Sequence, residues 1–319
     1  MKIFFLVLIS TSIYASDILT NYRLNGINEI EKQMDLELSQ KTYWSNYISD
    51  KDTKFGYLES YSNVLTCNIE KSTLNLYRLD SNKKFKFQKE YGAFTGKAKG
   101  DKVKEGDLKT PIGVYNLTKK LSKVDSFYGP MAFVTSYPNT YDRYRGKNGH
   151  GIWIHGLPTK QERDEFTKGC IAIDNSNIEC LDRNIDIRDT ILIIDSSKVK
   201  QKISKQVISS ILSELYKWRF AWKYNDLDSY LSFYTNEFVR SDGMSFAKFK
   251  NYKTRVFNKI EKRTIIFKNI NVIPYPNSTN IYQVTFSERY KSDTFEFNGE
   301  KILIVRLEAD NNMKILTEK

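Results

Sequence analysis

Residues 151–173 read "GIWIHGLPTKQERDEFTKGCIAI" and combine a strand pattern with reactive side chains. The alternation in "IWIH" puts Ile152 and Ile154 on one face of a short strand and Trp153 and His155 on the other. The polar stretch "LPTKQERDEF" then returns the chain to Cys170, which is followed by a second apolar run. This pattern predicts β structure around a polar loop.

The flanking sequence extends the β pattern over residues 61–197. Residues 63–94 alternate apolar and polar side chains and are broken at "DSN" (80–82), which predicts a hairpin. The segment "GDLKTPIGVYNL" contains a turn marked by proline and glycine, and "DTILIIDSS" closes the block. We therefore expect one mostly β domain here.

Helical and mixed patterns flank this domain. Residues 1–15 resemble a secretory signal cleaved after Ala15, because a lysine precedes an apolar stretch too short to span a bilayer. In residues 16–60, apolar positions recur at helical spacing (Ile27, Ile30, Met34 and Leu38). One such helix cannot bury its own apolar stripe, so it packs on the following domain or forms a homodimer.

Residues 203–319 follow a polar connector, "SSKVKQK", and begin with helical periodicity. Asn225 and Asp226 interrupt it and cap a second helix. A third helix is expected near 245–260, and strand patterns follow. Helices ahead of an antiparallel sheet predict an α+β domain, so the whole chain is expected to be multidomain α+β.

The charge and cysteine content narrow the function classes. The net charge is +12, about +11 once Lys2 is removed, but the basic residues are scattered rather than in blocks typical of nucleic-acid binding. An exported basic protein suits an anionic polymer such as the cell wall. Three cysteines leave at least one thiol unpaired within a single chain in an oxidising compartment.

The two histidines of the chain, His150 and His155, both lie within twenty residues of Cys170. An imidazole on an adjacent strand lowers the pKa of a thiol and accepts its proton, so His155 is the expected partner of Cys170. Gly169 allows a tight turn in which amide groups converge on an oxyanion. A disulfide from Cys170 to Cys67 or Cys180 stays open on these grounds.

A zinc site is a further alternative. His150, His155, Cys170 and Cys180 have suitable ligand types, although their spacing is unfamiliar for zinc.

The segments "IHG", "TKGCI" and, upstream, "LKTPIG" resemble the motifs of the L,D-transpeptidase catalytic domain, over about residues 61–196. The resemblance implies a β-sandwich-like domain that needs no cofactor or metal. It implies Cys170 as nucleophile, His155 as general base and acid, and the Gly156 carbonyl as the group orienting the imidazole. The N–H groups of Gly169 and Cys170 would form part of the oxyanion hole.

The motif departs from the common family pattern at two positions, where Lys168 and Ala172 replace histidine and arginine. A substrate carboxylate must then be bound by another cation. The candidates for substrate contact are His150, Trp153, Thr167, Lys168, Arg143 and Arg145, with Lys147 as a further cation.

Residues "WRFAWKYNDLDSYLSFYTNEFV" resemble the opening helices of NTF2-like domains, which hold a pocket. Trp218, Trp222, Tyr230 and Phe233 could line that pocket, but at helical spacing we expect core packing. The three parts together resemble cell-shape-determining L,D-carboxypeptidases. This implies a periplasmic enzyme that trims peptidoglycan stem tetrapeptides, with an unidentified ligand in the C-terminal pocket.

Overall fold

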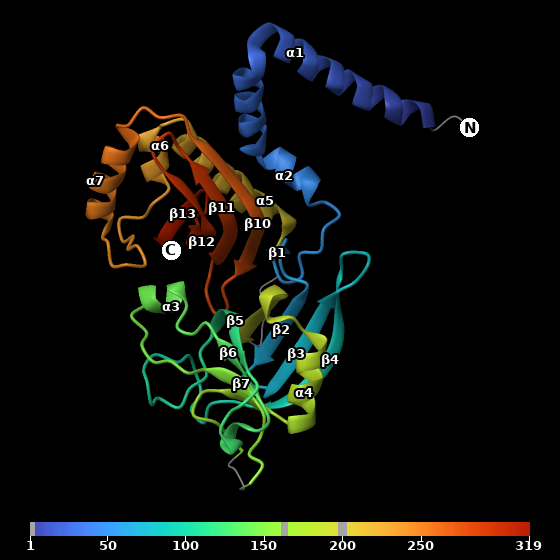
Figure 1. Ribbon diagram of the computed structural model, residues 1–319, viewed down its shortest axis with the longest axis vertical. Coiled ribbons are helices and arrows are strands. Elements are labelled where there is room, and N and C mark those ends of the chain that lie inside the picture. Colours follow the sequence, from blue (N-terminus) through green and yellow to red (C-terminus); the bar gives the residue numbers. More distant parts are fainter. Residues whose placement is uncertain (1–3, 161–164, 197–202) are drawn as a thin grey trace.

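The computed structural model describes residues 4–160, 165–196 and 203–319, and the side chains from residue 17 onward. It comprises an N-terminal helical arm, a β barrel and a C-terminal α+β domain, so the expected multidomain α+β class is confirmed (Figure 1). Most of the expected connector, residues 197–202, lies outside the described residues, as do residues 1–3 of the expected signal sequence. None of the described helices is both long enough and apolar enough to cross a membrane.

The N-terminal arm consists of α1 (Phe4–Leu38) and α2 (Lys41–Tyr47). Gly26 interrupts α1 with non-helical angles (φ 77°, ψ 178°), and the part before it extends away from both domains (Figure 1). The expected helical segment is shorter than predicted, because β1 (Tyr57–Leu58) pairs with a strand of the C-terminal sheet.

The last turns of α1 dock on the C-terminal domain. Asp35 lies 2.8 Å from Arg219 and 2.5 Å from Lys223, and Ile30 is buried while Ile27 and Met34 are exposed. Burial works to raise the pKa of Asp35, but hydrogen bonds from Lys223 and Arg219 outweigh it and lower that pKa below its usual range. The predicted packing of this helix on its own chain is thus present for its C-terminal half.

The predicted β domain is a closed barrel with the strand order β2-β3-β4-β8-β7-β6-β5-β9. Its strands are β2 (Asn63–Asn68), β3 (Thr73–Leu79), β4 (Phe85–Phe94), β5 (Gly113–Leu121), β6 (Ala132–Thr135), β7 (Trp153–His155), β8 (Ile171–Ile173) and β9 (Thr190–Asp195). The implied sandwich is corrected to a barrel, because β4 pairs with both β3 and β8 while β5 pairs with both β6 and β9. The two layers are therefore joined at both edges.

Short helices connect the barrel strands. They are η1 (Ser126–Tyr128), α3 (Thr140–Tyr144), α4 (Asn175–Asn184) and η2 (Ile187–Asp189). Apolar side chains of alternate strand positions fill the interior, including Ile154, Ile171 and Ile173.

The C-terminal domain packs helices on an antiparallel sheet ordered β1-β10-β11-β12-β13. Its elements are α5 (Lys205–Lys223), α6 (Leu227–Ser232), α7 (Phe246–Phe257), β10 (Thr264–Pro274), β11 (Ile281–Lys291), β12 (Glu296–Leu307) and β13 (Met313–Glu318). The side chain of Asp226 accepts from the Ser229 N–H, which confirms the predicted cap of the second helix.

A cluster of buried apolar side chains joins the barrel to the C-terminal domain. Val64, Val114 and Ile191 from the barrel pack with Ile273 and Tyr275 from the C-terminal sheet, and all five are buried. This shared core sets the relative placement of barrel and C-terminal domain.

Candidate active site

Cys170 lies at the end of the loop that precedes β8, and its side chain is partly exposed. Gly169 precedes it with φ +134°, where a Cβ would come 2.7 Å from the Lys109 carbonyl oxygen. Both facts require glycine at 169. The Sγ of Cys170 lies 3.4 Å from the Gly151 carbonyl oxygen, so the turn presents the thiol at the barrel surface beside the loop that leads into β7.

His155 ends β7, which runs parallel to β8 with His155 opposite Ala172. The strand that bears the imidazole therefore adjoins the strand that follows the thiol. The Nδ1 of His155 lies 2.6 Å from the Gly156 carbonyl oxygen. A carbonyl can only accept a hydrogen bond, so Nδ1 carries a proton and, in the neutral ring, the acceptor lone pair lies on Nε2.

Tyr128, which the sequence patterns did not single out, packs its ring against both His155 and Trp153. Its ring meets His155 edge-on at 5.1 Å and packs on Trp153 at 5.0 Å. Burial raises the pKa of Tyr128, and the nearby Cys170 charge raises it further, so its hydroxyl stays protonated. Trp153 and His155 share this side of β7, as the alternation predicted.

The Gly169 N–H, predicted as part of the oxyanion hole, is already engaged within its own turn. The Gly169 N–H donates to Thr167 Oγ1 at 3.0 Å, and that hydroxyl donates to the Cys170 carbonyl at 2.7 Å. Thr167 is buried and closes this turn, and its predicted contact with substrate stays a prediction. The sequence suggested a free Gly169 donor because the hydroxyl that engages it lies two residues away within the same turn.

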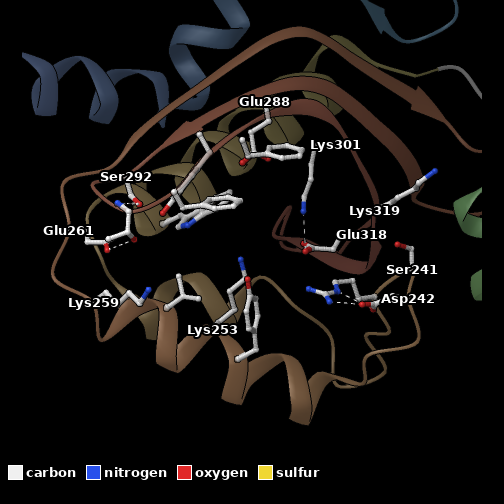
Figure 2. A pocket seen from close by; sticks show the side chains of 18 of the residues that line it. Ser241, Asp242, Lys253, Lys259, Glu261, Glu288, Ser292, Lys301, Glu318 and Lys319 are labelled. Atoms are coloured by element: carbon white, nitrogen blue, oxygen red, sulfur yellow. Dashed lines mark hydrogen bonds and ion pairs between the residues drawn. The ribbon is translucent and has the colours of Figure 1, made fainter.

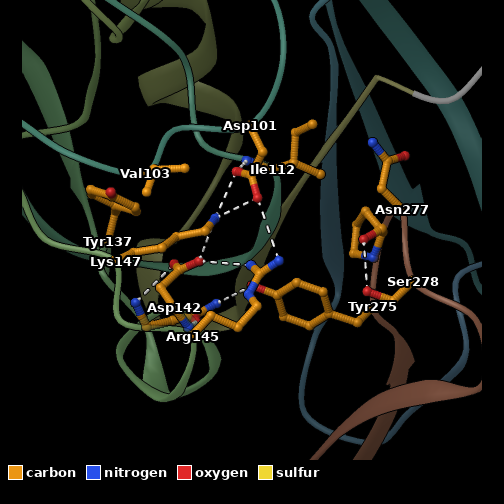
Figure 3. Close-up of polar contacts among 12 residues, drawn as sticks. Asp101, Val103, Ile112, Tyr137, Asp142, Arg145, Lys147, Tyr275, Asn277 and Ser278 are labelled. Atoms are coloured by element: carbon orange, nitrogen blue, oxygen red, sulfur yellow. Dashed lines mark hydrogen bonds and ion pairs between the residues drawn. The ribbon is translucent and has the colours of Figure 1, made fainter. Parts of the chain in front are cut away.

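Arg145 and Lys147, two of the candidate cations for the substrate carboxylate, are both held in ion pairs. Both pair with Asp142, at 3.0 and 2.9 Å, and both pair with Asp101, at 3.4 and 2.6 Å (Figure 3). Tyr275 of the C-terminal domain lies beside this cluster, with the Arg145 guanidinium 5.4 Å from its ring. These two cations hold loops and the domain interface together, and their charge is balanced by the two carboxylates.

The other candidates for substrate contact remain on the surface. Lys168 and Arg143 are exposed, and His150 is exposed with Nδ1 3.9 Å from a Glu105 carboxylate oxygen. Ala172, by contrast, is fully buried between β4 and β7. Of the three exposed positions, Lys168 is the nearest in sequence to the thiol.

Cys67, Cys170 and Cys180 are not in disulfide bonds, so neither disulfide alternative for Cys170 is present. Cys67 is buried, and Cys180 lies 3.8 Å from Lys89 Nζ. Across the described ranges, no three histidine, cysteine, aspartate or glutamate side chains gather in a way that could hold a metal ion, which contradicts the zinc alternative.

A cavity of about 680 Å³ lies in the C-terminal domain (Figure 2). Of the four aromatic residues considered from the sequence, Trp222 lines it, and Trp218, Tyr230 and Phe233 belong to the core. The expected core packing is therefore confirmed for these three, and Trp222 also faces a pocket.

Two lysines reach into this cavity from opposite sides (Figure 2). Lys301 pairs with Glu318 at 3.1 Å. Lys253 is buried over the rings of Trp222 and Tyr230, at 4.6 and 4.9 Å, and within the described residues it forms no ion pair. Burial lowers the pKa of Lys253 to about 8. The cavity thus combines aromatic surface with a cation that has no carboxylate partner in contact.

A barrel that joins a His-Gly strand end to a Gly-Cys turn on the neighbouring strand defines the L,D-transpeptidase class of catalytic domain. The chain belongs to this family. Residues 62–194 match the L,D-transpeptidase catalytic domain, and residues 210–319 match the Cds6 C-terminal NTF2-like domain.

Solved structures share this architecture over most of the chain. The helical cell shape determining protein Pgp2 from Campylobacter jejuni is 38% identical, with a TM-score of 0.80 over 88% of this chain and 100% of that one. Bd1075 of Bdellovibrio bacteriovorus is 26% identical, with a TM-score of 0.64 over 81% and 92% of the two chains.

A shorter match links the chain to a curated relative. YafK of Escherichia coli K12, named as an L,D-transpeptidase, is 36% identical over 80 residues, which are 25% of this chain and 29% of that protein. The match therefore spans less than a third of YafK.

Proposed function

We propose that this protein is an exported peptidoglycan L,D-carboxypeptidase that removes the terminal D-alanine of stem tetrapeptides. The observation that carries the proposal is the pairing of β7 with β8, with His155 Nδ1 2.6 Å from the Gly156 carbonyl and a partly exposed Cys170 at the start of β8. The similarity to Pgp2 across both domains supports a role in cell shape.

In the proposed reaction His155 Nε2 takes the proton of the Cys170 thiol, and the thiolate attacks the carbonyl of the third stem residue. The tetrahedral oxyanion collapses, the C–N bond to D-alanine breaks, and His155 returns the proton to the departing amine. Water, deprotonated by His155, then attacks the thioester. The products are a tripeptide carboxylate and the free thiol.

The alternative fate of the same thioester is attack by an amine of another stem, which would make the protein a crosslinking L,D-transpeptidase. We favour hydrolysis because the three-part architecture is that of a cell-shape determinant rather than of a stand-alone catalytic domain. With Arg145 and Lys147 held in ion pairs, we assign contact with the substrate carboxylate to exposed Lys168, with Arg143 as the second candidate.

Incubation with purified disaccharide tetrapeptides, with and without an acceptor amine, tests the proposal. Wild-type protein and a Cys180→Ala control should release D-alanine and tripeptide, whereas Cys170→Ala should release neither. Equal lack of product from wild type and Cys170→Ala would instead favour a catalytically silent wall-binding scaffold. Crosslinked dimers formed by wild type would favour transpeptidation.

The C-terminal cavity is proposed to hold a carboxylate-bearing part of the same polymer against Lys253 and Lys301. Its aromatic walls suit an apolar or sugar face beside that carboxylate. Lys253→Met should weaken binding of purified sacculi in a pull-down while leaving tetrapeptide turnover by the barrel intact. Export through the signal at residues 1–15 predicts a mature N-terminus at Ser16 in periplasmic extracts.

A further inference from the structure

The carbonyl that contacts His155 belongs to the peptide between Gly156 and Leu157. A peptide unit is planar, so its C=O and N–H point in opposite directions and turn together. The Gly156 carbonyl meets His155 Nδ1 at 2.6 Å, and the N–H on the other side of the same plane, that of Leu157, donates to Asn175 Oδ1 at 2.7 Å. Asn175 therefore controls the orientation of the group that orients the imidazole.

The preceding peptide is held as well. The Gly156 N–H donates to the Tyr128 carbonyl at 3.0 Å, and Tyr128 also packs its ring on His155. Glycine has unusual freedom in φ and ψ, so without such bonds the Gly156–Leu157 plane could rotate and withdraw its carbonyl. One hydrogen bond on each side of Gly156 removes that freedom.

Close packing around Gly156 shows how tightly Asn175 is fitted. A Cβ on Gly156 would lie 2.3 Å from Asn175 Oδ1, and a Cβ on Gly129 would lie 2.5 Å from the same atom. Gly129 also has φ +74°. Two glycines thus make room for one amide oxygen behind the imidazole.

Asn175 lies close to the nucleophile in the sequence. It begins α4, and Cys170 lies five residues earlier, immediately before β8. The same segment, from the turn at Cys170 through β8 to the start of α4, therefore carries both the nucleophile and the side chain behind the Gly156–Leu157 peptide. None of the sequence motifs marked Asn175, because its partner Leu157 lies beyond a variable loop.

We propose that Asn175 is a positioning residue for the general base, acting through the Gly156–Leu157 peptide to keep His155 in the Nδ1–H tautomer with Nε2 available to the thiol. The inference rests on the proposed function for its catalytic consequence. Its structural content, one fixed tautomer of His155, stands independently of the substrate.

The test compares full-length Asn175→Ala, Asn175→Asp and, on the same helix, Asn177→Ala. Asp keeps an oxygen acceptor for the Leu157 N–H, and Ala removes it. With tetrapeptide as substrate, Asn175→Ala should lower kcat about 10- to 100-fold with KM little changed, as for other groups that orient a reactive ligand from behind. Asn175→Asp should recover most of this loss, and Asn177→Ala should match wild type.

The second readout is the ring ¹⁵N spectrum, which contains only two imidazoles and is assigned with a His150→Gln variant. In a Cys170→Ser background at about pH 8.5, where free imidazole is neutral, His155 should be the Nδ1–H tautomer. Adding Asn175→Ala should give a mixture of tautomers. Should that variant fail to fold, Asn175→Ser keeps a polar helix start while drawing the oxygen away from Leu157.

A wild-type kcat in Asn175→Ala, or an unchanged single tautomer in the double variant, would overturn the proposal. So would equal loss in the Asp and Ala variants, because the acceptor would then be irrelevant. If wild type itself releases no D-alanine, the proposed function fails, and the tautomer comparison still decides the role of Asn175.

Discussion

Replacement of Asp142 by asparagine should destabilise the fold strongly, because this carboxylate is the centre of the cluster between the barrel loops. Asp142 is fully buried. Its Oδ2 accepts from the Asn139 N–H at 3.1 Å and the Tyr115 hydroxyl at 3.0 Å, and its Oδ1 accepts from Arg145 at 3.0 Å and pairs with Lys147 at 2.9 Å. Each oxygen thus serves two donors.

The magnitude follows from that geometry. An asparagine offers one acceptor oxygen, so two of the four contacts are lost and an NH₂ group faces two donors. Hydrogen bonds to a charged group contribute about 1.5–3 kcal/mol each, and breaking a buried ion pair costs about 3–5 kcal/mol. Since Asp101 still pairs with Lys147 and Arg145, we expect a loss of about 3–5 kcal/mol.

Scanning calorimetry provides the assay. At about 2–4 °C per kcal/mol for a unit of 150–250 residues, the barrel transition should fall by about 6–20 °C. Glu308→Gln is the matched control, because its pair with Arg306 is exposed and should contribute less than about 1 kcal/mol. An Asp142→Asn transition no lower than that of the control would refute the reasoning.

Three further predictions concern other parts of the chain. Burial raises the pKa of the Cys67 thiol to about 12. Iodoacetamide at about pH 8 should therefore modify Cys170 and leave Cys67 unmodified in native protein, as measured by peptide mass spectrometry. Equal modification of the two cysteines would contradict this prediction. Burial lowers the pKa of Lys253 from 10.5 to about 8. At pH values between these two, Lys253 is protonated in the unfolded chain and neutral in the folded chain, so the free energy of unfolding rises with pH. Lys253→Met should remove that slope and add about 1–3 kcal/mol at pH 7 in denaturant titrations, and an unchanged slope would count against it. The exposed apolar residues ahead of Gly26 predict that the protein forms a homodimer through this part of α1. In analytical ultracentrifugation, wild type should therefore sediment as a dimer and the double variant Leu19→Asp, Leu24→Asp as a monomer. A monomeric wild type would contradict the prediction.

Asp35 and Lys253 should affect stability at opposite ends of the pH range, because the pKa of each group is lowered by folding. Asp35 has a lowered pKa, so its contribution to docking α1 is present above the ordinary carboxylate range and is lost as the pH falls through the lowered value. Lys253 acts at the opposite end of the scale. The arm should therefore loosen in acid while the C-terminal pocket gains stability in mild base.

Local pattern by itself determined the elements and their faces. Alternation predicted the hairpin of β3 and β4 with its turn at residues 80–82 and the strand that bears His155, and helical periodicity with Asp226 predicted α5 and α6. These features depend on side chains close together in the chain, which is why they could be inferred. The motif around Cys170 also showed which domain family the barrel belongs to.

Tertiary structure decided which polar groups are already engaged. Arg145 and Lys147 look like free surface cations in sequence, but loops from separate segments bring Asp101 and Asp142 against them. Asn175 meets the Leu157 N–H only because β7 and β8 lie side by side. A strand pattern specifies the face on which a side chain lies, whereas its hydrogen-bond partner depends on the register and closure of the whole barrel.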